Sequence, residues 1–294
     1  MHWRVLPGKK TGGCMNPGTG QARGYFARKK LRRRKSLHLF RKFQIEQRRG
    51  SATFGLMRPL LLPLLLIGIA GFSQAQDTPK PKDIPETYRK LFQQAVMSYE
   101  QQNFEAALKT LDEADAAFPN YSETYNLKGG IYTQMRDFPK ARELFTKALE
   151  LNADSYPVRF NLAEIEFLEK KYDDSRKAFE SLRKTIEADK VVSRDAVSNL
   201  LSLIDYKVFL TYLLQDNMAE AERIQKNFSF ADNTPNYYFG NAAMAFKKND
   251  TADGQSWLSS ADRIYPPQLN RLYADSFFEI GWIQKPAQPA FSQP

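Results

Sequence analysis

FEAALKTLDEADAAFPN, residues 104–120, recurs in altered form as FPKARELFTKALELNAD at 138–154 and YDDSRKAFESLRKTIEAD at 172–189. Each copy begins with an aromatic residue, has a small residue three places later, and continues with apolar residues at helical spacing. Corresponding positions lie 34 residues apart in four rows: Phe104, Phe138 and Tyr172; Ala107, Ala141 and Ser175; Leu111, Phe145 and Phe179; and Ala114, Ala148 and Leu182. Several independent rows with one period indicate a repeat rather than the core of an ordinary helical bundle.

A second row of small residues lies upstream at the same interval: Ala95, Gly129 and Ala163. Two amphipathic helices in a 34-residue unit resemble the tetratricopeptide repeat family, over nearly all of residues 88–267. The matching residues of the second unit are Tyr125, Gly129, Tyr132, Phe138, Ala141, Phe145 and Ala148. The family's closing proline is present as Pro119 and Pro266, but Ala153 replaces it in the second unit. The resemblance implies an all-α fold, a tetratricopeptide-type α-solenoid of stacked helix-turn-helix repeats.

The repeat register predicts about five helix pairs within a solenoid spanning residues 88–284. After the third unit the register breaks, because Ser175 and the next small residue, Ala221, are 46 residues apart, 12 more than one period. The extra residues fall near 190–201 and predict a longer helix or loop. The next interval, from Ala221 to Gly254, is 33 residues, so a degenerate fifth unit follows.

The C-terminal end of the repeat array predicts a cap. Residues 268–284 are expected to form a last helix, because terminal repeats need a covering element with a more polar outer face. Phe278 and Trp282 are expected to pack inward on the fifth unit. Residues 285–294 contain three prolines and are expected to be a disordered tail.

Charge divides the chain into two unequal parts. Residues 1–56 hold 15 Lys and Arg against one acid, whereas residues 76–294 hold 27 Lys and Arg against 32 acids. The chain's net charge of +10 therefore belongs to a basic leader, and the body is mildly acidic. Residues 1–56 are interpreted as a disordered leader or a mis-annotated upstream extension; a membrane-anchored cytoplasmic tail and a nucleic-acid-binding arm are the alternatives. The body is not expected to bind nucleic acid.

Residues 57–75 read as a secretory signal peptide. Arg58 precedes the apolar segment Leu60–Phe72, and Ser73-Gln74-Ala75 forms a cleavage site of the small-x-small type. The apolar segment is about 20 Å long as a helix, too short for a hydrocarbon core of about 30 Å. A Pro-rich linker is expected at 76–87. The resemblance is therefore to an exported bacterial tetratricopeptide protein, periplasmic or secreted after cleavage near Ala75, and the alternative is a short membrane anchor with the body outside the cytosol.

The body lacks the side chains that most catalytic and metal sites use. Cys14 is the only cysteine, His2 and His38 are the only histidines, and all three precede residue 57. The body therefore has no Ser-His-Asp or Cys-His nucleophile pair and no Cys/His zinc site. We expect no enzymatic activity, cofactor or metal; a carboxylate-based enzyme remains a remote alternative, with acidic clusters at Glu164/Glu166/Glu169 and Asp173/Asp174.

The predicted function is a non-enzymatic scaffold that holds a protein or peptide. The resemblance implies a concave wall built from the first helix of each pair, where asparagine often contacts the ligand backbone. Mapping by repeat position gives the expected peptide-binding residues: Arg89, Tyr99, Asn126, Thr133, Phe160, Asn161, Glu164, Phe167 and Tyr206. The alternative is a structural, homo-oligomeric or envelope-assembly component that uses the convex face or the end cap.

Overall fold

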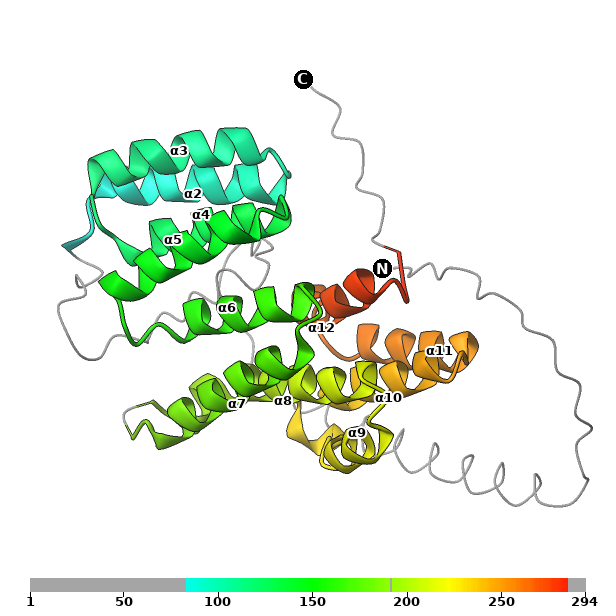
Figure 1. Cartoon of the computed structure of the whole chain (residues 1–294). Coiled ribbons are helices and arrows are strands. Elements are labelled where there is room, and N and C mark those ends of the chain that lie inside the picture. Colours follow the sequence, from blue (N-terminus) through cyan, green and yellow to red (C-terminus); the bar gives the residue numbers. More distant parts are fainter. Residues whose placement is uncertain (1–82, 191, 285–294) are drawn as a thin grey trace, which may run out of the picture. The chain divides into compact units, whose positions relative to one another are not determined.

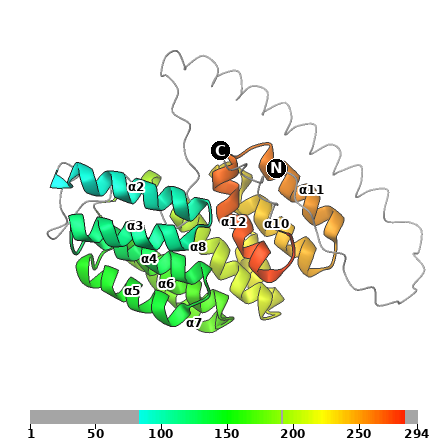
Figure 2. The same ribbon diagram turned by 90° about the horizontal axis from the view of Figure 1, so that it is seen from above.

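The computed structural model describes residues 83–190 and 192–284, which form eleven α-helices and one short 3₁₀ helix (Figures 1 and 2). The predicted leader, signal peptide and C-terminal tail lie outside the described residues, as does most of the linker. The helices are α2 Glu86–Glu100, α3 Phe104–Ala117, α4 Ser122–Gln134, α5 Phe138–Leu151, α6 Tyr156–Leu168, α7 Tyr172–Ala188, α8 Arg194–Leu214, α9 Met218–Gln225, η3 Phe230–Asp232, α10 Asn236–Lys247, α11 Thr251–Asp262 and α12 Pro267–Ile280.

The helices pack as five consecutive antiparallel pairs, with α12 left over at the end (Figure 1). The pairs are α2/α3, α4/α5, α6/α7, α8/α9 and α10/α11; we call the first member helix A and the second helix B. In the first four pairs, helix B also contacts helix A of the next pair. The predicted all-α solenoid of five helix-turn-helix repeats and a last helix is therefore confirmed.

A repeated turn connects helix A to helix B in every unit. The residue two places before helix B has a left-handed backbone with φ near +60°, at Gln102, Arg136, Lys170, Asp216 and Asn249. The next residue is the N-cap, and in four units its side chain accepts a hydrogen bond from a backbone N–H in the first turn of helix B: Asn103, Asp137, Asn217 and Asp250. The third unit has Lys171 at this place, and no side chain caps α7.

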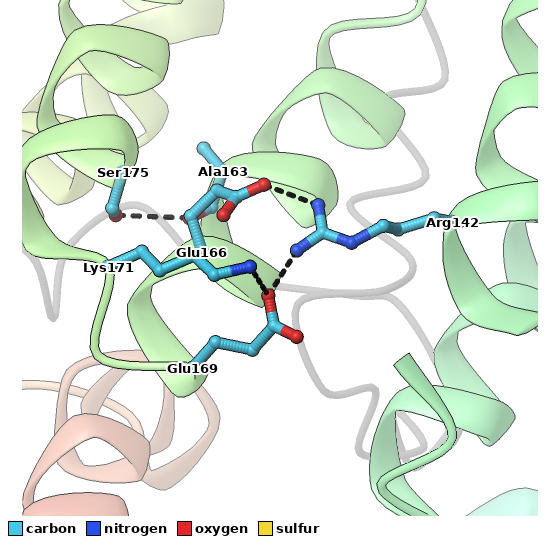
Figure 3. A network of polar contacts seen from close by, with 6 residues as sticks. All are labelled: Arg142, Ala163, Glu166, Glu169, Lys171 and Ser175. Atoms are coloured by element: carbon cyan, nitrogen blue, oxygen red, sulfur yellow. Dashed lines mark hydrogen bonds and ion pairs between the residues drawn. The ribbon is translucent and has the colours of Figure 1, made fainter. Parts of the chain in front are cut away.

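Close packing within a pair requires the predicted row of small residues. A Cβ atom added at Gly129 would lie 2.7 Å from a ring carbon of Phe145, closer than packed carbon atoms approach. Ala141 on α5, one of the predicted small residues, is fully buried. In the third unit, the Ser175 hydroxyl donates a 3.0 Å hydrogen bond to the backbone oxygen of Ala163 (Figure 3). Helices A and B can therefore approach closely because a small residue leaves room at each of these contacts, for the ring of Phe145 in the second unit and for the Ser175–Ala163 hydrogen bond in the third.

An arginine at one repeat position links consecutive units. Arg142 on α5 forms ion pairs with Glu166 on α6 and with Glu169 just after it (Figure 3). One period later, Arg176 on α7 places its guanidinium 4.2 Å from the ring centroid of Tyr212 on α8. The same position of helix B thus contacts the following helix A by an ion pair in one unit and by a cation–π contact in the next.

The break in repeat register is accommodated by longer helices. α7 has 17 residues where α5 has 14, and α8 has 21 where α6 has 13. Of the described residues, only α8 includes a segment long and apolar enough by composition to cross a membrane, Val197–Leu214. Since 67% of that segment is buried and α8 contacts α7, α9, α10 and α12, its apolar character is explained by its place in the core.

The missing N-cap of α7 allows a stability prediction. The backbone of Lys171, φ −80° and ψ 63°, is close to that of the capping residue Asp137, φ −86° and ψ 73°. Lys171→Asn should therefore cap α7 without rearrangement and raise the free energy of unfolding by about 1 kcal/mol in urea titration. The lost Lys171–Glu169 pair is exposed and contributes little.

Asn103→Ala serves as the matched control, because it removes an existing cap and should lower stability by a similar amount. A destabilising Asn103→Ala combined with an unchanged Lys171→Asn would contradict the prediction for α7.

Candidate functional site

The candidate site is the side of the solenoid formed by α2, α4, α6, α8 and α10, which we call the A-helix face. Neighbouring helices of this set contact each other directly, α2 with α4, α4 with α6, and α8 with α10. Helix α12 lies against this face rather than only at the end of the stack (Figure 2), since it contacts α8 as well as α10 and α11. Glu279 of α12 also pairs with Arg136 in the turn after α4. Ser276 of α12 accepts a hydrogen bond from Lys207 of α8, which in turn pairs with Glu164 of α6.

Aromatic side chains hold the centre of α12. Tyr206 on α8 is fully buried, and its ring centroid lies 5.0 Å from that of Tyr273 on α12. Phe239 on α10 contacts the same tyrosine at 5.4 Å and Phe277, one turn further along α12, at 5.7 Å. The Tyr273 hydroxyl reaches across to Ser202 on α8 at 3.0 Å. One turn of α12 thus supplies two aromatic rings to a binding surface made by two A helices.

A buried ion pair lies beside these rings. Lys207 on α8 is fully buried, and its Nζ atom donates to Glu164 Oε1 on α6 at 2.6 Å and to Ser276 Oγ on α12 at 2.7 Å. The ammonium also lies 4.9 Å from the ring centroid of Phe167. The second carboxylate oxygen of Glu164, Oε2, is buried and has no hydrogen-bond partner. Side chains of α6, α8 and α12 therefore meet at Lys207, and its counter-ion Glu164 has one carboxylate oxygen without a hydrogen bond.

Charges on the earlier units also face α12. Arg136, in the turn after α4, forms an ion pair with Glu279 of α12. At the end of α2, burial raises the pKa of the Glu100 carboxyl, and the charge of Arg271 on α12 lowers it in part. Oε1 of Glu100 is buried without a hydrogen-bond partner. The side of α12 that faces the first two units is thus polar, whereas its central contact with α8 and α10 is aromatic.

Most of the predicted peptide-binding residues are buried in this structure. Buried side chains are those of Tyr99, Asn126, Phe160, Asn161, Phe167 and Tyr206. Glu164 and Thr133 are partly buried, and Arg89 is exposed. The amide of Asn161 donates to Asn126 Oδ1 at 2.9 Å, and the ring of Phe160 packs on Phe179 with centroids 5.0 Å apart. The aromatic members thus belong to the core and do not line an open wall; binding by the nine residues stays a prediction.

The structure brings Glu164 and Phe167 together through Lys207, and it places Tyr206 directly under α12. Lys207 and Ser276 were missed by the sequence analysis. A signal for Lys207 existed, because it stands 46 residues after Asn161, at the same repeat position, and is a charged residue inside the apolar stretch DYKVFL. Ser276 had no comparable signal, because α12 falls outside the repeat register.

The acidic clusters do not form free carboxylate pairs. Each of their carboxylates has a cationic neighbour: Glu164 with Lys207, Glu166 and Glu169 with Arg142, Asp173 with Arg176, and Asp174 with Lys177. In the described part of the chain, no three His, Cys, Asp or Glu side chains group in a way that could hold a metal ion. The A-helix face thus combines buried aromatic rings with a few buried polar groups.

Comparison with known proteins agrees with the repeat architecture. The family model described as tetratricopeptide repeat matches residues 132–192. The type IV pilus assembly protein PilF of Pseudomonas aeruginosa is 31% identical over 84 residues, which are 28% of this chain. The matched stretch spans 33% of that relative.

Among solved structures, a tetratricopeptide repeat protein from Parabacteroides merdae superposes with a TM-score of 0.49 at 18% identity, covering 64% of this chain and 70% of that one. PilF of Pseudomonas aeruginosa gives 0.46 at 16% identity, covering 66% and 86%. The type IV pilus biogenesis factor PilW gives 0.47 at 15% identity, covering 67% and 87%.

The burial of Phe160 distinguishes a core residue from a ligand contact. Phe160→Ala should lower the free energy of unfolding by about 3–5 kcal/mol, because the cavity lies within the packed third unit. Arg89→Ala, at an exposed position on the same face, should change it by no more than about 0.5 kcal/mol. Urea unfolding followed by circular dichroism measures both; an unchanged stability of Phe160→Ala would place this ring in an open wall after all.

Proposed function

We propose that this tetratricopeptide repeat protein is a non-enzymatic scaffold that binds a protein segment on its A-helix face. The observation that carries the proposal is α12 itself, since this face already holds an amphipathic helix. Tyr206 and Phe239 supply aromatic anchors, and Lys207 supplies a directional polar contact. Aromatic anchors surrounded by polar groups are typical of protein–protein contacts, and helix-in-groove binding uses side chains one turn apart.

The chemistry of the body supports binding rather than catalysis. Nucleophile–base pairs that depend on His or Cys are unavailable, because the body contains neither residue. Glu164, the acidic residue of the predicted binding set, is paired with Lys207. A paired, largely enclosed carboxylate is better suited to holding helices together than to transferring protons.

We place the body outside the cytosol, after cleavage near Ala75. Two features support this location. Residues 57–75 have the charge, apolar length and small-x-small ending of a secretory signal. The body, from residue 76 onward, contains no cysteine and so cannot form unwanted disulfides in an oxidising compartment.

A second candidate function is a component of an envelope assembly, either as a homo-oligomer or within a larger complex. The observation that favours it is the similarity to a protein named for type IV pilus assembly. This role would use the convex face or the end cap in addition to the A-helix face.

In-cell photo-cross-linking tests the binding surface. A photoreactive phenylalanine analogue at Thr133 or at exposed Arg89, both on A helices, should yield discrete cross-linked partner bands. The analogue at Lys177, exposed on helix B of the third unit, is the matched control and should yield none.

Cross-links from Lys177 alone would contradict the assignment to the A-helix face.

Sedimentation velocity distinguishes the second candidate, the homo-oligomer, from a monomeric scaffold. A concentration-dependent rise in sedimentation coefficient, together with cross-links between copies of this chain, would favour the homo-oligomer.

Mapping the mature N-terminus by mass spectrometry tests the location. Protein isolated from its native cells should begin at Gln76 and yield no peptide from residues 1–56. Peptides that join the leader to the body would overturn cleavage, and the basic segment would then become the first place to look for a nucleic-acid or lipid partner.

A further inference from the structure

We propose that α12 is a displaceable internal ligand of the A-helix face. Its competitor is a partner helix with two aromatic side chains one turn apart and a basic residue just before the first. This inference rests on the proposed function, because it names the class of partner and the contact that controls access to the same surface. The pattern is read from α12, where Arg271 precedes Tyr273 and Phe277.

The contacts of α12 exceed those that an end cap requires. A cap needs to cover only the last unit, α10 and α11. Ser276 instead reaches Lys207 in the fourth unit, and through it Glu164 in the third, while Glu279 reaches Arg136 in the second. α12 therefore lies along the surface that the earlier units would offer to a partner, and both cannot occupy it together.

The centre of this contact contains a built-in weakness. Lys207 is fully buried and contacts Ser276 of α12, the side chain of its partner Glu164 is 19% exposed, and Glu164 Oε2 is buried without a hydrogen bond. Burying an ion pair costs desolvation free energy that the mutual attraction often fails to recover, so apolar residues of similar size would hold α12 more tightly. When α12 leaves, the Lys207 ammonium loses its contact with Ser276 and gains access to water. The regained hydration offsets part of the lost aromatic contact.

The edge of the contact favours a more basic occupant. Glu100 on α2 has a buried oxygen without a hydrogen-bond donor, and the charge of Arg271 on α12 acts on this carboxyl without donating to that oxygen. The Arg136–Glu279 pair is partly exposed and so contributes little. A partner helix whose basic side chain donates directly to Glu100 would satisfy a group that α12 leaves unsatisfied.

Native-state hydrogen exchange on the full chain tests whether α12 opens independently. Amides of α12 should exchange at least tenfold faster than those of α8 and α10, because α12 detaches without global unfolding. The double variant Glu164→Leu with Lys207→Met should slow exchange in α12 at least tenfold, since it replaces the buried pair by apolar side chains. Lys207→Met alone should accelerate it, because Glu164 then loses its counter-ion.

Identical exchange in α12, α8 and α10 for the wild-type chain would overturn the proposal, as would a double variant that opens faster than the wild type. Lys177→Met, at an exposed site on α7, is the matched control and should leave α12 unchanged.

A synthetic peptide of residues 267–280 serves as the probe for the partner class. Glu279→Arg in the full chain places like charges at Arg136 and loosens α12 at its edge, so this variant should bind the labelled peptide at least fivefold more tightly than wild type. A peptide with Tyr273→Ala and Phe277→Ala should not bind.

Equal binding of both peptides, or no binding of either to the Glu279→Arg chain, would overturn the displaceable ligand. Cross-links from Thr133 in cells would still support the scaffold in that case. Peptide exchange without any cross-linked partner would instead count against the scaffold, so the two failures are distinguishable.

Discussion

A pair of packed helices cannot bury both of its faces, and the rest of this structure depends on that constraint. In the first four units, helix B packs against its own helix A and also against helix A of the following unit. After the fifth unit, α12 is the element that contacts α10 and α11, and it contacts α8 as well. Stability and access to the A-helix face therefore depend on the same helix.

The internal geometry of each unit follows from a few local positions, which is why the sequence predicts it well. Gly129 lies under Phe145, and the 34-residue rows set where such close contacts recur. A left-handed residue followed by a capping side chain then reverses the chain. Lys171 lacks the capping side chain, but its backbone, φ −80° and ψ 63°, stays close to that of Asp137 in the second unit.

The contacts of the candidate site were harder to predict, because repeat position does not determine which element covers a buried side chain. Phe160 and Tyr206 occupy equivalent positions, 46 residues apart, yet different elements cover them. Phe160 packs on Phe179 within its own unit, whereas Tyr206 is covered by Tyr273 of α12, far along the chain. A helix outside the repeat register gives no signal of where it will lie, so the contact of Tyr206 with α12 required the structure.

Lys207 shows why burial alone does not separate a structural residue from a functional one. Removing this lysine would leave the Glu164 carboxylate enclosed without its counter-ion, so a single truncation would read as a loss of structure. Replacing both charges together tests a different quantity, namely how tightly α12 is held once neither charge must be withdrawn from water. A gain in that test means that the ion pair limits the docking of α12. An ion pair that weakens the docking of α12 makes it easier for a partner helix to displace α12 from the A-helix face.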